Sequence, residues 1–119
     1  MNYATKANVK PGTLLCHAWG ATMLHHNFFQ VIEVKGSKVK LGVPICRAEG
    51  NQEGYEWIEA ACPNPEYVRN AKFVGDELRL CGKPGEKTWD GKSCEWKQAR
   101  SWASLTIQEI GKKEHFYGD

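Results

Sequence analysis

A small set of cysteine and histidine side chains near the N-terminus offers the clearest potential for chemistry in this chain. Cys16 and His17 are adjacent, and the pair His25 and His26 follows shortly after them. A structural zinc ion needs four ligands in a tetrahedral arrangement, whereas adjacent residues of an extended chain point to opposite faces. The pattern therefore predicts no metal site and favours a structural role for these side chains.

The same residues could instead form a nucleophilic cysteine–histidine pair. Such a pair needs a thiolate near neutral pH and a third group that orients the histidine, and the sequence identifies no such group. A Gly-x-Ser-x-Gly nucleophile elbow and a glycine-rich phosphate loop are also absent from the sequence. We therefore predict a non-enzymatic protein with no cofactor, and we keep an enzyme that uses Cys16 with His17 or His25 as an alternative.

Aromatic and basic residues are interleaved in the C-terminal half of the chain. Exposed aromatic side chains in a basic groove stack bases of single-stranded nucleic acids. The candidate nucleic-acid-binding residues are Arg79, Lys87, Trp89, Lys92, Lys97 and Arg100, and Lys35, Lys38 and Lys40 form a second basic strip. Acidic residues dilute the charge of the first set, and the alternative is that its tryptophans belong to the core.

A β-hairpin predicted over 27–43 is the element around which the chain is organised. Its second arm alternates Val39 and Leu41 with Lys38 and Lys40, so that one face enters a core while the lysines stay in water. The first arm is apolar on both faces, which is typical of a central strand that is covered on two sides.

The remaining chain reads as short strands joined by turns. Strands are expected at 13–19, 55–60, 71–74 and 77–81, with a polar loop at 48–54, a helical turn within 63–69 and an Asp-Gly turn at 89–92. The segment 95–110 fits either a helix or a strand, and 102–110 is predicted as a strand. The expected fold is mainly β, a small antiparallel sheet or partial barrel of the SH3-like or OB-like kind with at most one short helix.

Length and composition are those of one ordinary globular domain. The chain has 119 residues, 41% of them hydrophobic, and a formal net charge of only +2, so no field of the whole protein directs it to nucleic acid or membrane. We expect a single domain over 1–119 with flexible tails at 1–10 and 112–119. Five cysteines without a Cys-x-x-Cys pair, and the lack of an apolar leader or membrane span, predict a cytoplasmic protein.

Three stretches resemble a group of small uncharacterised phage and mobile-element proteins. The first two are Gly12–Gly20, which ends in Trp-Gly, and Asn27–Val39, which contains Phe-Phe-Gln-Val and a valine-rich hairpin; the third is Trp89–Lys92, with the sequence Trp-Asp-Gly-Lys. Together they cover about a third of the chain. The sequence departs from the pattern at Ala21–His26, which replace a polar loop, and at Phe29, which replaces tyrosine.

The resemblance implies an origin in a phage or mobile element. Small non-catalytic phage proteins often act by occluding a host protein or nucleoprotein, as anti-restriction and anti-CRISPR inhibitors do, and a host-defence component is therefore the expected partner. The candidate partner-binding residues are Glu49, Glu53, Tyr55, Glu56 and Trp57, in and beside the predicted loop, and their carboxylates could mimic nucleic-acid charge. The alternative is a β-barrel module that binds nucleic acid directly.

Overall fold

The computed structural model describes residues 2–20, 23–98 and 104–118, and these contain strands but no helix. The strands in chain order are β1 (Leu14–Trp19), β2 (His25–Lys35), β3 (Lys38–Gly42), β4 (Ile45–Gly50), β5 (Glu53–Ala60), β6 (Tyr67–Val74), β7 (Glu77–Leu80), β8 (Thr106–Ile107) and β9 (Glu114–Tyr117).

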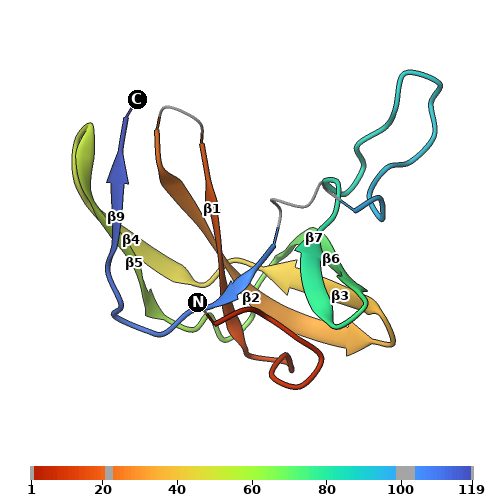
Figure 1. Ribbon diagram of the computed structural model, residues 1–119, viewed down its shortest axis with the longest axis horizontal. Coiled ribbons are helices and arrows are strands. Elements are labelled where there is room, and N and C mark those ends of the chain that lie inside the picture. The colour runs from red at the N-terminus through yellow and green to blue at the C-terminus, as the bar shows by residue number, and fades with distance from the viewer. Residues whose placement is uncertain (1, 21–22, 99–103, 119) are drawn as a thin grey trace.

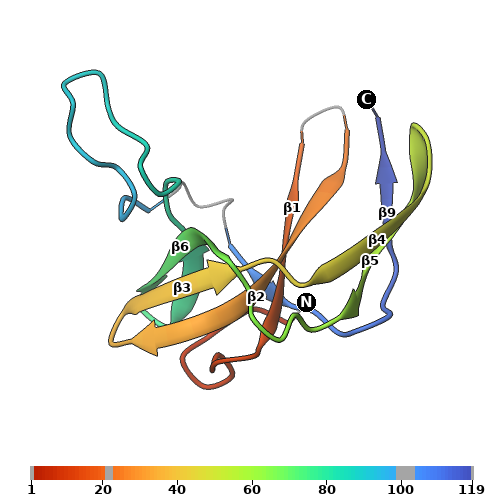
Figure 2. The same cartoon turned by 180° about the vertical axis from the view of Figure 1, so that it is seen from behind.

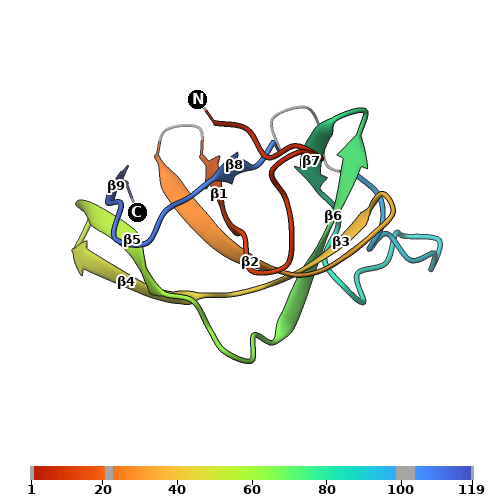
Figure 3. The same ribbon diagram turned by 90° about the horizontal axis from the view of Figure 1, so that it is seen from below.

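Two antiparallel sheets make up the fold. The larger sheet has the order β7-β6-β3-β2-β1-β8, and the smaller one has the order β4-β5-β9. Figure 1 shows the smaller sheet on one side of the upright β1–β2 hairpin and the strands β3, β6 and β7 on the other. Seen from below, the larger sheet is strongly curled (Figure 3). The predicted class, a mainly β fold with a small partial barrel, is confirmed.

The hairpin predicted over 27–43 is present as β2 and β3, and β2 is covered on both faces as expected. Phe29 and Val31 are buried in the main core with Val39 and Leu41 of β3. Phe28, on the opposite face of β2, packs into a second cluster with Cys16 and Ile58. β2 therefore joins the two halves of the molecule, because each of its faces contributes to a different core.

The predicted loop at 48–54 is wrong, because these residues form the end of the β4–β5 hairpin. Glu49 pairs with Tyr55, and Gly50 pairs with Gly54 across a tight turn. Gly50 has a φ of 107°, which favours glycine, and a Cβ on Gly54 would collide with the carbonyl oxygen of Glu49. All six residues of β4 are exposed, so the segment lacks the apolar alternation by which a strand is recognised.

Both predicted tails belong to the fold. Ala4 and Val9 are buried in the main core, and the amide of Ala4 donates to the carbonyl of Leu105 at 2.9 Å. At the other end, β9 pairs with β5.

Two local predictions also differ from the structure. No helical turn forms within 63–69, where β6 begins at Tyr67. The strand predicted over 102–110 is reduced to β8, and residues 99–103 lie outside the described part of the chain.

A long loop over residues 82–98 leaves the body after β7 and projects away from both sheets (Figure 2). The predicted Asp-Gly turn lies at its tip, where the amide of Thr88 donates to the carbonyl of Lys92 and the amide of Gly91 to that of Thr88, both at 2.9 Å. Across the described ranges, no helix is long and apolar enough to span a membrane.

Candidate functional site

The outer face of the β4-β5-β9 sheet carries a group of aromatic side chains, which we call the aromatic face: Tyr55, Trp57, His115 and Tyr117. Tyr55 of β5 lies directly opposite His115 of β9, with ring centroids 5.5 Å apart, and His115 lies 5.9 Å from Tyr117. Tyr55 is 47% exposed and Tyr117 is 43% exposed. Strand alternation places all four side chains on one side of the sheet, so they form one continuous surface.

Acidic and basic residues around the aromatic face lie in pairs. The three pairs are Arg47 with Glu59 (Nε to Oε1, 2.6 Å), His115 with Glu53 (Nε2 to Oε1, 2.9 Å) and Lys113 with Glu49 (Nζ to Oε2, 3.9 Å). Lys113 Nζ also lies 4.7 Å from the centroid of the Trp57 ring. Each carboxylate of the face thus has a basic partner. The aromatic rings, with Tyr55 and Tyr117 exposed, are the part of this surface that is not already engaged in ion pairs.

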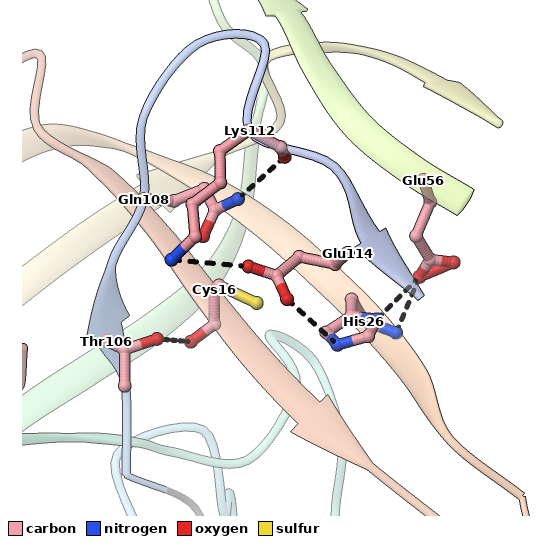
Figure 4. Close-up of polar contacts among 7 residues, drawn as sticks. All are labelled: Cys16, His26, Glu56, Thr106, Gln108, Lys112 and Glu114. Atoms are coloured by element: carbon pink, nitrogen blue, oxygen red, sulfur yellow. Dashed lines mark hydrogen bonds and ion pairs between the residues drawn. The ribbon is translucent and has the colours of Figure 1, made fainter. Parts of the chain in front are cut away.

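Glu56, which was predicted to bind the partner with its neighbours, instead points to the inner side of the sheet (Figure 4). Its side chain is 14% exposed. Its Oε1 accepts a hydrogen bond from the backbone amide of His26 at 2.7 Å. The same oxygen lies 3.3 Å from His26 Nδ1, in an electrostatic contact that lacks hydrogen-bond geometry. Glu56 therefore connects the two sheets and is not part of the aromatic face.

Glu56 belongs to a cluster around His26 that we call the His26 cluster. His26 Nε2 lies 3.9 Å from Oε2 of Glu114, and Glu114 Oε1 lies 3.6 Å from Nζ of Lys112. Gln108 Nε2 donates to the carbonyl of Lys112 at 3.2 Å. The ring of His26 is nearly parallel to that of Phe28, at a centroid distance of 6.2 Å. These contacts join β2, β5 and β9.

Cys16 lies beside the His26 cluster (Figure 4). Burial of the thiol, and then the negative charges of Glu114 and Glu56, raise the pKa of Cys16 to about 12. The thiol is therefore protonated near neutral pH. A raised pKa disfavours the thiolate that a cysteine nucleophile requires.

The other two histidines of the sequence motif lie in separate surroundings. Burial lowers the pKa of His17 below its usual value. His25 stacks between Trp19 and Phe116, with ring centroids 5.2 and 5.8 Å away. Among residues 2–20, 23–98 and 104–118, no three His, Cys, Asp or Glu side chains are placed to hold a metal ion.

The candidate nucleic-acid-binding residues divide between two places. Arg79 lies on β7, where its Nη2 is 3.4 Å from Oε2 of Glu77. Trp89 is 99% exposed near the tip of the 82–98 loop. Three other candidate nucleic-acid-binding residues lie in the same loop, namely Lys87, Lys92 and Lys97. Arg100 lies outside the described residues.

Sequence reasoning missed the contribution of β9 to the aromatic face. Glu114–Tyr117 alternate between partly or fully buried and exposed positions, with Phe116 buried between His115 and Tyr117. That alternation is the signal that could have identified a strand. Four residues at the end of a chain are too few for it to stand out.

Comparison with protein-family models finds no match, and comparisons with curated proteins and with solved structures find no match either.

Proposed function

We propose that the protein is a non-enzymatic binding protein that recognises a macromolecular partner, a protein or nucleoprotein, through the aromatic face. The observation that carries this proposal is the exposure of Tyr55 and Tyr117 on either side of His115. Tyrosine and tryptophan are enriched where proteins bind one another, because they bury a large area at a small cost in side-chain entropy.

The setting of these rings also favours protein recognition. Two paired strands, β5 and β9, hold the rings, so little backbone entropy is lost on binding. The paired charges around the rings resemble the polar rim that surrounds the apolar centre of many interfaces.

The partner class comes from the sequence resemblance. Similarity of Gly12–Gly20, Asn27–Val39 and Trp89–Lys92 to phage and mobile-element proteins supports a host-defence protein or nucleoprotein, inhibited by occlusion. The cytoplasm is the proposed place of action, and the five free cysteines support it.

The test is a binding titration with the partner captured from a nuclease-treated host lysate. Tyr55→Ala and Tyr117→Ala are compared with Tyr3→Ala, a matched control with 46% exposure outside the aromatic face. Interface hot spots cost about 2 kcal/mol or more on truncation, which corresponds to roughly thirtyfold in Kd. We expect at least one aromatic-face variant to reach this loss while Tyr3→Ala keeps the affinity of the unmodified protein.

Circular dichroism and urea unfolding check that each variant is folded. Folded variants of Tyr55 and Tyr117 that both bind as tightly as Tyr3→Ala would exclude the aromatic face.

A further inference from the structure

Four basic side chains form a row across the larger sheet, and we call them the cationic row. Lys35 pairs with Lys38, Lys38 with Lys72, and Lys72 with Arg79. Directly paired residues on neighbouring strands place their side chains on the same face of the sheet. Four strands, β2, β3, β6 and β7, therefore present one cation each along a single line.

The charges of the cationic row repel one another. Like charges directly opposite one another destabilise a sheet. Of the four residues, Arg79 alone has a carboxylate within ion-pair distance in the described part of the chain, namely Glu77. The other face of these strands is the core, with Val34, Val39, Ala71 and Leu80 in the neighbouring row. Lys35, Lys38 and Lys72 thus have no carboxylate within ion-pair distance among the described residues.

Aromatic rings lie beside the cationic row. Lys38 Nζ is 4.9 Å from the centroid of Trp96, at the base of the 82–98 loop, and Lys40 Nζ is 5.5 Å from that of Tyr67. A surface groove of about 520 Å³ is lined here by Glu33, Lys35, Ser37, Lys38, Lys40 and Trp96. The two basic regions that are separate in the sequence therefore meet in the fold.

The projecting loop adds further positive charge and an exposed ring. Its three carboxylates accept hydrogen bonds from the loop's own backbone amides: Glu86 from Lys83 (2.9 Å), Glu95 from Gly85 (3.2 Å) and Asp90 from Lys92 (3.3 Å). Its lysines, by contrast, form no ion pair with any described residue. Trp89, in the same loop, is 99% exposed.

We infer that the cationic row, together with Trp96 and the loop that carries Trp89, is a binding site for single-stranded nucleic acid. The row contacts the phosphates, and the exposed indole of Trp89 stacks on an unpaired base, which a duplex does not offer. A membrane surface fits less well, because the neighbours of Trp89 at the tip are Thr88, Asp90 and Gly91, and interfacial insertion needs a larger apolar area.

The inference goes beyond the proposed function, since the aromatic face lies on the other sheet. The two surfaces together would suit a nucleoprotein target. Their tests are independent, because the residues of the cationic row are not in the aromatic face.

The experiment is fluorescence anisotropy with a labelled single-stranded DNA of about 15 nucleotides, near the upper end of site sizes for such proteins. Affinity is measured at several salt concentrations for the unmodified protein, for Lys38→Gln/Lys72→Gln and for Lys6→Gln/Lys10→Gln. The last variant is the matched control, because it removes the same charge from two exposed positions that do not belong to the row.

We expect binding that weakens steeply with salt. The Lys38→Gln/Lys72→Gln variant should lower the magnitude of the slope of log K against log salt by about 1.4. Each phosphate contact to a single strand contributes about 0.7 to this slope, and the variant removes two such contacts. The control should keep more of the slope and of the affinity. Trp89→Ala should weaken binding roughly five- to 150-fold, the loss expected for one stacked base.

Several results would overturn the inference. They are undetectable binding at low salt, equal loss in the row variant and in its control, equal affinity for a duplex of the same length, or binding to phosphatidylserine vesicles without binding to DNA. Misfolding cannot mimic the expected loss if urea unfolding shows the row variant to be as stable as the unmodified protein.

Discussion

Removal of the Glu56 carboxylate should uncouple the two sheets. In the structure its Oε1 accepts the backbone N–H of His26 at 2.7 Å, while the side chains of Glu56 and His26 are only 14% and 5% exposed. Glu56→Ala leaves that amide without its partner in a place that water reaches poorly. The variant should therefore lose stability although it deletes a charged residue from a strand whose only fully buried residue is Ile58.

The size of the effect follows from the kind of hydrogen bond. A bond to a charged acceptor contributes about 1.5–3 kcal/mol, and a loss of about 2 kcal/mol shifts the urea midpoint of a small domain by roughly 1 M. Glu56→Gln keeps an acceptor oxygen without the charge, so we expect a loss of roughly half that size.

Urea unfolding followed by tryptophan fluorescence measures these changes. Glu53→Ala is the matched control, because Glu53 lies on the same strand with its side chain 71% exposed and contacts His115 at the surface. Its effect should stay within about 0.5 kcal/mol. The reasoning fails if Glu56→Ala is no more destabilising than Glu53→Ala.

Three further outcomes follow from the structure. Lys72→Gln should raise the free energy of unfolding by about 0.2–1 kcal/mol, because it relieves the directly opposed like charges of Lys38 and Arg79; a lower midpoint in urea would contradict this. Ile58→Ala should cost about 2–5 kcal/mol in the same assay, since Ile58 is 0% exposed in the cluster between the sheets, and a smaller loss would show that this cluster is loosely packed. Cys16 should react with iodoacetamide more slowly than exposed Cys46 near neutral pH. The free energy of unfolding should fall as pH rises from about 9 to about 12, because the Cys16 thiol loses its proton at lower pH in the unfolded chain than in the folded one. Both effects should be absent if the Cys16 thiol is accessible.

Local pattern was sufficient to predict much of the larger sheet. The hairpin of β2 and β3 is visible in the sequence because its two arms are adjacent and one arm alternates Val39 and Leu41 with lysines. The hairpin of β6 and β7 was predicted at 71–81 for the same reason. In both cases the turn and the apolar alternation lie within one short stretch of chain.

In the smaller sheet, β5 was predicted as the strand at 55–60, but its two neighbours were not. β4 is an edge strand with every residue exposed, and β9 is a four-residue strand that pairs with β5 from a distant part of the sequence. The pairing of β9 with β5 depends on the packing of Phe116 and the contacts of Glu114, which no local pattern reveals.

The candidate sites show the same division. Glu49, Glu53, Tyr55 and Trp57 lie on one surface, whereas the period of the strand turns Glu56 to the opposite face. The cationic row needs three registers to be known at once, so neither basic strip in the sequence could indicate that Lys38 and Lys72 are neighbours.

The most direct test of the aromatic face is a capture experiment from nuclease-treated host lysate at two salt concentrations. Tagged unmodified protein is compared with Tyr55→Ala/Tyr117→Ala and with Tyr3→Ala. We expect a protein that is retained at both salt concentrations by the unmodified chain and by Tyr3→Ala, and that is lost with the double variant. Equal retention by the folded double variant, or loss of all captured protein after nuclease treatment, would contradict it.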